Sequence, residues 1–140
     1  MRKRASGALG VAFVILIAMT ALAQVAYAGS PHFVSLSKSI SGSTATVSGK
    51  VAGLGDETQI HVEATAEVAC LNPGEQFPSA ENKQTVGAGG DFPVQNGKAT
   101  FSLTLTATFK PKCSPPMTLV WGSITVTVSG DSFASFSRTI

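Results

Sequence analysis

Residues 59–70 read QIHVEATAEVAC, and this stretch decides the fold of the chain. Apolar side chains occupy every second position from Ile60 to Cys70, and mostly polar side chains occupy the positions between them. Because successive side chains of a β-strand point to opposite faces, this alternation predicts a strand with one face in a core and the other in water. Half-buried strands of this kind are typical of antiparallel sheets.

The same alternation recurs elsewhere, with Ser and Thr at most of the alternate positions. It is clear in four further segments, residues 34–40, 45–51, 99–107 and 124–128. No segment after residue 28 shows helical periodicity. The pattern therefore predicts an all-β domain.

The dipeptide Asn96-Gly97 is a strong signal for a two-residue hairpin turn, because both of its positions need positive φ. A turn here predicts that residues 83–94 form one strand and pair with residues 99–107. In this register, apolar residues lie opposite each other on one face. The predicted pairs are Val94 with Ala99, Phe92 with Phe101, Ala88 with Leu105, and Val86 with Ala107.

The last part of the chain predicts a second hairpin with a three-residue loop at residues 130–132. This loop length matches Val128 with Ala134 and Val126 with Phe136. The apolar phase shifts between Trp121 and Ile124, which predicts a β-bulge near Gly122.

The chain has two cysteines, Cys70 and Cys113. We expect them to form a disulfide, because both follow a segment typical of export to an oxidising compartment. The alternative, a reactive thiol pair, lacks the close spacing of a redox motif. If residues 83–94 form one strand that runs back along the domain, both cysteines reach the same end of it. If residues 83–94 formed two short antiparallel strands, the cysteines would lie too far apart to bond.

Seven such strands with hairpins and one bridge predict a single antiparallel β-sandwich of the immunoglobulin-like or a related type. Trp121 follows both cysteines instead of lying between them, so we do not expect a true antibody-type domain.

Residues 1–28 have the pattern of a secretory signal peptide. Arg2-Lys3-Arg4 precedes an apolar run over residues 9–22, and small residues precede Gly29. We therefore expect residues 29–140 to be a secreted domain without a transmembrane anchor, released into the medium or loosely associated with the cell wall. The remaining chain has seven basic and eight acidic side chains, so a nucleic-acid surface is not expected.

Two long loops, residues 71–82 and 108–117, are expected at the end that the disulfide ties together. Loops on a rigid scaffold often carry binding residues. Phe77 and Phe109 are candidate exposed anchors, and Lys110 and Lys112 lie beside Phe109 in the chain. The alternative is that both rings cap the open end of the core.

No catalytic motif is present, and we expect no enzyme, no cofactor and no metal. His61, Glu63 and Glu67 share the polar face of one strand, but zinc normally needs a further ligand, and we interpret this face as solvated. Residues 130–132, Gly-Asp-Ser, lack the strand-to-helix elbow of a hydrolase nucleophile and are interpreted as a turn.

The segment Cys70-Leu71-Asn72-Pro73-Gly74, followed by Pro78, Asn82-Lys83, Asn96-Gly97 and the late Cys113, resembles a group of small exported bacterial proteins with two cysteines and no assigned function. The resemblance covers most of residues 30–140 and implies fold and export. A further analogy is to the chromophore-carrying apoproteins of the neocarzinostatin type, which are small exported sandwiches with two disulfides, whereas only one is possible here.

These observations favour a non-enzymatic secreted binding protein that acts through its disulfide-tied loops. Its partner would be an extracellular protein, a wall component or a small apolar ligand. The alternatives are a structural component of the cell envelope or matrix, and a carrier of a small apolar ligand.

Overall fold

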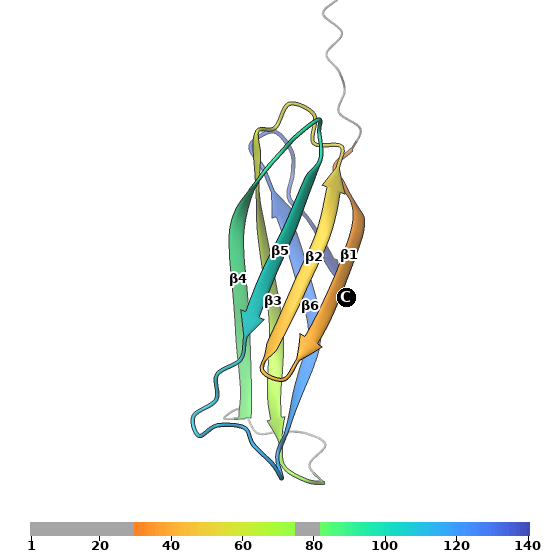
Figure 1. The fold of residues 1–140 in the computed structure, drawn as a ribbon. Helices are drawn as coiled ribbons and strands as arrows, with labels where there is room; N and C mark the ends of the chain where they lie inside the picture. Colours follow the sequence, from red (N-terminus) through yellow and green to blue (C-terminus); the bar gives the residue numbers. More distant parts are fainter. Residues whose placement is uncertain (1–29, 75–81) are drawn as a thin grey trace, which may run out of the picture.

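The computed structural model describes residues 30–74 and 82–140, which form two antiparallel sheets lying face to face (Figure 1). The predicted signal peptide, residues 1–28, and the predicted contact residue Phe77 lie outside the described residues. The strands are β1 (His32–Ser41), β2 (Thr44–Ala52), β3 (Gln59–Leu71), β4 (Lys83–Pro93), β5 (Ala99–Thr106), β6 (Thr118–Ser129) and β7 (Phe136–Thr139).

One sheet has the strand order β1-β2-β5, and the other has the order β4-β3-β6-β7. The prediction of a single antiparallel β-sandwich with about seven strands is therefore confirmed. In the constant-type immunoglobulin arrangement the fourth strand lies beside the fifth, whereas here β4 pairs with β3. The immunoglobulin-like subtype stays a prediction.

β3 lies inside the four-stranded sheet and follows the alternation that the sequence predicted. Its side chains at even positions from Ile60 to Cys70 are buried, and those at odd positions from Gln59 to Glu67 are exposed. The buried face packs against the other sheet through aliphatic and phenyl side chains, and no polar side chain is buried among the described residues. The hydrophobic effect therefore favours this register over a slip by one residue, which would expose the apolar face.

The Asn96-Gly97 turn is present, with φ of 53° and 71°, but it does not join two neighbouring strands of one sheet. Pairing across this turn is limited to a bridge between Gln95 and Lys98. β4 then pairs with β3 and β5 pairs with β2, so the chain crosses from one sheet to the other at this turn. The pairs predicted between residues 86–94 and 99–107 are therefore wrong.

Phe92 and Phe101 show why the pattern misled. Their ring centroids lie 6.0 Å apart, but they meet across the core from opposite sheets. Matching apolar faces cannot distinguish hydrogen-bonded neighbours from residues that face each other between two sheets. The expectation of one strand over residues 83–94 is sound, because β4 runs without interruption from Lys83 to Pro93.

The hairpin between β6 and β7 has a longer loop than predicted. Val128 pairs with Phe136 rather than with Ala134, and Val126 pairs with Arg138. The additional residues allow the ring of Phe133 to pack against Phe136, with centroids 5.9 Å apart. An aromatic contact, which alternation does not reveal, accompanies the longer loop.

The predicted bulge near Gly122 is confirmed. Ala66 pairs with Ile124 and Val68 pairs with Trp121, so two residues of β6 lie opposite Glu67 alone. A Cβ at Gly122 would approach the Glu67 carbonyl oxygen to 3.1 Å, which explains the small residue at this position. The bulge keeps inward side chains on the core face on both sides of the phase shift.

Two groups of contacts fasten the sheets where β1 faces β6 and β7. The Trp121 indole N–H donates a hydrogen bond of 3.0 Å to the Gly42 carbonyl in the turn between β1 and β2. Phe33 packs edge to face on Phe136, with ring centroids 5.1 Å apart, and the Arg138 guanidinium lies 5.3 Å from the centre of the Phe33 ring. Aromatic and cation–π contacts thus close this side of the sandwich.

Candidate functional site

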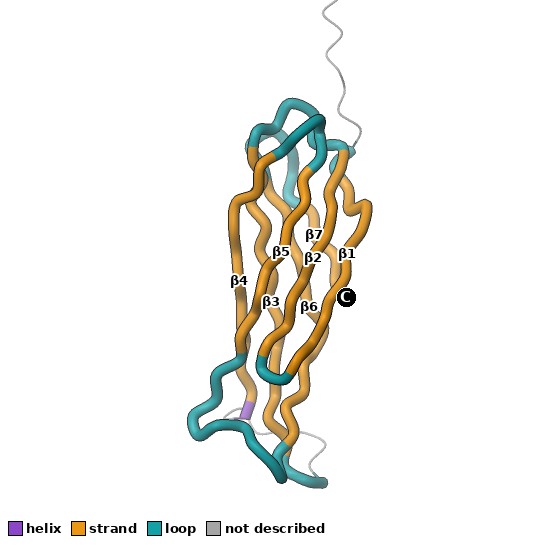
Figure 2. Tube along the Cα trace, in the orientation of Figure 1, coloured by secondary structure: helices purple, strands orange, loops and turns teal. Residues whose placement is uncertain are grey.

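The predicted disulfide is present and defines one end of the sandwich, which we call the loop end. Cys70 near the end of β3 is bonded to Cys113 in the segment after β5, with a Cα–Cα distance of 5.8 Å. Figure 2 shows this segment as a long connection below the strands. The opposite end, which carries the Asn96-Gly97 turn, is called the hairpin end.

Two hydrogen bonds with Gln84 of β4 hold the connection between β5 and β6 at Thr108. The Gln84 side-chain amide donates to the Thr108 carbonyl at 3.0 Å, and the Thr108 backbone N–H donates to Gln84 Oε1 at 3.0 Å. The Gln84 amide therefore satisfies the N–H and C=O of Thr108, as a neighbouring strand would, at the point where β5 has ended. Residues 107–117 contain no strand, but they are held at Thr108 and at Cys113, and the Ala107 N–H also donates to the Ser43 carbonyl at 2.8 Å.

A pocket of about 300 Å³ lies between these fastenings. Phe109 and Leu119 are half-buried and pack against the core, whereas Lys110 and Lys112 are exposed. The pocket thus combines apolar walls with two positive charges. Its lining residues are Ser43, Ala107, Thr108, Phe109, Lys110, Lys112, Cys113 and Leu119.

Phe109, Lys110 and Lys112 line this pocket together with Cys113. Their role as contact residues stays a prediction. The role of Phe109 lies between the two alternatives, because its ring packs against the core and also lines the pocket. Leu119 is a pocket residue that the sequence analysis missed. Its position in the alternating pattern of β6 indicated a core residue and gave no sign that its strand begins at the pocket.

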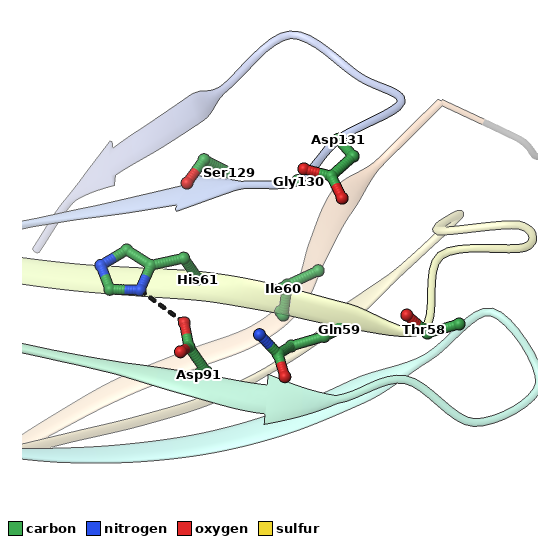
Figure 3. A pocket seen from close by; sticks show the side chains of 8 residues that line it. All are labelled: Thr58, Gln59, Ile60, His61, Asp91, Ser129, Gly130 and Asp131. Atoms are coloured by element: carbon green, nitrogen blue, oxygen red, sulfur yellow. Dashed lines mark hydrogen bonds and ion pairs between the residues drawn. The ribbon is translucent and has the colours of Figure 1, made fainter.

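A second pocket, also of about 300 Å³, lies near the hairpin end (Figure 3). His61 of β3 and Asp91 of β4 are directly opposite each other, and His61 Nδ1 lies 2.7 Å from Asp91 Oδ1. Both side chains are about half exposed, at 50% and 57%. The lining residues are Thr58, Gln59, Ile60, His61, Asp91, Ser129, Gly130 and Asp131.

Asp91, His61 and Ser129 form a row across three strands, but they are not arranged as a catalytic triad. A triad needs the second ring nitrogen of histidine to face the serine hydroxyl. Here a Cβ built at Gly89 would lie 3.4 Å from His61 Nε2, so this nitrogen lies over β4 and away from β6. The described residues give Ser129 no hydrogen bond to His61.

The sequence pattern alone does not connect His61 with Asp91. Their pairing depends on the register of β3 with β4, and the connection between these strands is too long to set that register by turn chemistry. The alternation of each strand predicts which face both residues occupy, but it does not predict that they are opposite each other.

Residues 130–132 form part of the loop between β6 and β7. The Ser132 hydroxyl and backbone N–H both donate to Glu57 Oε1, each at 2.6 Å. Both bonds hold the pKa of Glu57 below its ordinary value, and the bond from the hydroxyl has the larger effect. The Ser132 hydroxyl therefore donates to a carboxylate and links two loops at the hairpin end.

His61, Glu63 and Glu67 lie on the exposed face of β3. Within residues 30–74 and 82–140, no group of three or more His, Cys, Asp and Glu side chains is placed to hold a metal ion. The same parts of the chain contain no helix of the length and hydropathy needed to span a membrane.

Comparisons with protein-family models, with curated proteins and with solved structures give no match to this chain. The resemblance to small exported proteins with two cysteines therefore stays a prediction.

Proposed function

We propose that the protein is a non-enzymatic exported interaction domain that binds its partner through the loop end. The pocket lined by Phe109, Leu119 and the two lysines is the observation that carries this proposal. Export is supported by the signal-peptide pattern of residues 1–28 and by the Cys70–Cys113 disulfide, which is typical of oxidising compartments.

The chemistry of the pocket favours an extracellular partner that presents an apolar group beside a negative charge. The half-buried Phe109 and Leu119 provide apolar contact, and Lys110 and Lys112 lie where they can pair with an anionic group. The disulfide and the bonds between Gln84 and Thr108 hold these residues in place before binding, which reduces the entropy lost on binding. An acidic wall component or an acidic protein surface would satisfy both features.

The test compares binding to envelope fragments from the producing cells. The double variant Lys110→Glu, Lys112→Glu is expected to lose most of the bound protein in a sedimentation assay. A matched double variant, Lys50→Glu with Lys98→Glu, carries the same charge change far from the pocket and is expected to bind normally. Equal loss in both variants, or no loss in either, would reject the loop end as the binding site.

The alternative hypothesis that the protein carries a small apolar ligand would involve the same pocket. Native mass spectrometry of protein recovered from the culture medium distinguishes it, because a carried ligand adds a discrete mass. The variant Phe109→Ala should lose that mass.

A structural role in an envelope or matrix is the second candidate, and the outer face of sheet β1-β2-β5 favours it. Cross-strand partners place side chains on this face in four rows of three, and every position except Lys50 is Ser or Thr. A face with regular rows of hydroxyl groups suits ordered packing against itself or against a polysaccharide. Ordered assembly at high protein concentration would support this role, and a strictly monomeric protein would contradict it.

A further inference from the structure

β6 has a strand on both sides along only part of its length. β7 pairs with Thr125–Val128, and Ile124 exchanges two backbone hydrogen bonds with Ile140, at 2.8 and 2.9 Å. Residues 118–123 are flanked by β3 on one side, and no strand among the described residues lies on their other side. We call this side of residues 118–123 the open edge. Figure 2 shows β7 beside the upper part of β6 only.

The open edge presents backbone hydrogen-bonding groups. Ile124 faces the core and directs its N–H and C=O to Ile140. Along a strand the direction of the side chain and that of the backbone groups alternate together. Leu119 and Trp121 pair with the buried residues Cys70 and Val68, so they share the inward face of Ile124. Their N–H and C=O groups therefore point to the open edge.

Apolar side chains lie close to this edge. Val120 of β6 is 41% exposed, and Ile40 near the end of β1 is 46% exposed. Ile40 pairs with the buried Ala45, so it occupies the inner face of its sheet. It also lies two residues before Gly42, whose carbonyl accepts the Trp121 indole hydrogen bond. Val120 and Ile40 are two of the three large hydrophobic side chains that are exposed among the described residues.

We propose that the open edge is a strand-addition site, which binds an extended segment of a partner protein with apolar side chains at alternate positions. A peptide backbone matches the alternating donors and acceptors of Leu119 and Trp121, and it would continue the line of β7. The inward side chains of the added strand would cover Ile40. This mode of recognition takes affinity from backbone hydrogen bonds and specificity from alternate side chains.

Two further features define the added segment. Along the direction of β6, the open edge ends at Ile140 in one direction and at residues 113–117 in the other. It therefore accepts only a short strand. Lys38 occupies the same face of β1 as Ile40 and is exposed, so an acidic residue at the end of the added strand is favoured. A short, apolar strand with an acidic end is therefore the partner chemistry that fits.

The open edge is a different site from the loop-end pocket on which the proposed function rests, although Leu119 contributes to both. Lys110 and Lys112 do not belong to the open edge, and Ile40 and Lys38 do not line the loop-end pocket. Failure of one proposal therefore leaves the other standing, and no variant below changes Leu119.

The experiment uses a synthetic peptide of alternating valine and threonine with glutamate at one end. Trp121 is the only tryptophan of the chain, so its fluorescence reports binding at the edge directly. We expect a saturable fluorescence change and slower amide hydrogen exchange at Leu119 and Trp121. The same peptide with every second amide N-methylated lacks donors on one side and is expected not to bind.

Matched variants test the apolar contact. Ile40→Glu is expected to weaken peptide binding by about tenfold or more, because a charge would lie against the inserted side chains. Val34→Glu makes the same change at a side chain of β1 that is 55% exposed and distant from Gly42, and it should bind normally. Lys38→Glu should weaken binding of the acidic peptide but not of a peptide ending in lysine, which keeps the test valid if Ile40→Glu does not fold.

Three results would overturn the proposal. They are equal binding of the N-methylated peptide, equal loss in the Val34→Glu variant, and unchanged exchange of the Leu119 and Trp121 amides at saturating peptide. A peptide-free dimer in which these amides are already protected would identify a second copy of the chain as the occupant and would also reject a partner strand.

Discussion

The two ends of the sandwich are held together by different kinds of interaction. At the hairpin end, backbone hydrogen bonds join the turns: Leu54 N–H donates to the Gly97 carbonyl at 3.0 Å, and Val94 N–H donates to the Thr58 carbonyl at 2.9 Å. The Glu57 carboxylate, which accepts from Ser132, adds one side-chain link. At the loop end most contacts come from side chains, namely the disulfide, Gln84 and Trp121. One backbone hydrogen bond adds to them, from the Ala107 N–H to the Ser43 carbonyl at 2.8 Å.

This difference shows how a small sandwich can carry a long connection without a strand in it. Where the ladder continues into tight turns, backbone pairing orders the chain and leaves little freedom in sequence. Where the ladder ends, a few contacts, most of them made by side chains, order residues 107–117 and leave the positions between them free to vary. The loop end is therefore the end at which a binding surface can change without loss of the fold.

Removal of the disulfide should break the comparison most strongly. The double variant Cys70→Ala, Cys113→Ala is expected to lose about 4 kcal/mol of unfolding free energy in the chain-entropy model for a bridge spanning 43 residues. Urea denaturation measures the loss. Amide exchange in the folded variant should become faster at residues 107–117 and stay unchanged at the Asn96-Gly97 turn, whereas equal acceleration at both ends would contradict the comparison.

The hairpin end should be sensitive to added volume at Gly130. A Cβ there would lie 2.8 Å from Phe133 Cζ and 3.0 Å from Glu57 Oε1. We expect Gly130→Ala to lower the unfolding free energy by about 1–3 kcal/mol through overpacking. Gly87→Ala is the control, because the atom nearest to its new Cβ outside the neighbouring residues is the Ala64 carbonyl oxygen at 3.5 Å, and thermal unfolding of the two variants should differ clearly.

The amide of Gln84 offers a smaller change at the loop end. Gln84→Ala removes both hydrogen bonds to Thr108 and is expected to cost about 1 kcal/mol, because both groups remain accessible to water. Gln84→Glu keeps the acceptor for the Thr108 N–H and loses the donor. Its melting temperature should lie between those of the original protein and the alanine variant, and a value at or below that of the alanine variant would show that the retained bond from the Thr108 N–H adds no stability.

The smallest effect is expected from Glu57, and it depends on pH. The ordinary pKa of this carboxyl is 4.5, and in the folded protein the hydrogen bonds from Ser132 lower it. The contribution of Glu57 to stability is therefore fully present above pH 4.5. The contribution is lost as the pH falls through the folded pKa. Melting temperatures between pH 7 and pH 3 should therefore fall less in Glu57→Gln than in the original protein, and parallel curves would show that this carboxylate is not linked to stability.

Alternation in residues 59–70 was sufficient to predict the face, length and burial of β3. The disulfide and the bulge at Gly122 also followed from the sequence, because each depends on local phase or on the direction of strands. The pairing across Asn96-Gly97 could not be predicted in the same way. Apolar alternation assigns each strand an inward face but does not say to which of two sheets the strand belongs.

The candidate site was predictable to a similar degree. Phe109, Lys110 and Lys112 lie close to Cys113 in the sequence, so a tethered loop was enough to group them. Leu119 enters the pocket from another segment, and His61 meets Asp91 only through the register of β3 with β4. Such contacts depend on long-range pairing, for which neither strand carries a local signal.

The position of the two cysteines along the chain has a consequence for the order of events during the export that we propose. A chain that leaves the membrane from its N-terminus would expose Cys70 while β4, β5 and Cys113 still have to follow. The bond can close only after five strands have emerged, so the thiol of Cys70 meets any oxidant before its partner arrives. With two cysteines there is a single possible intramolecular pairing, and oxidative folding of this domain therefore requires an electron acceptor but no isomerase.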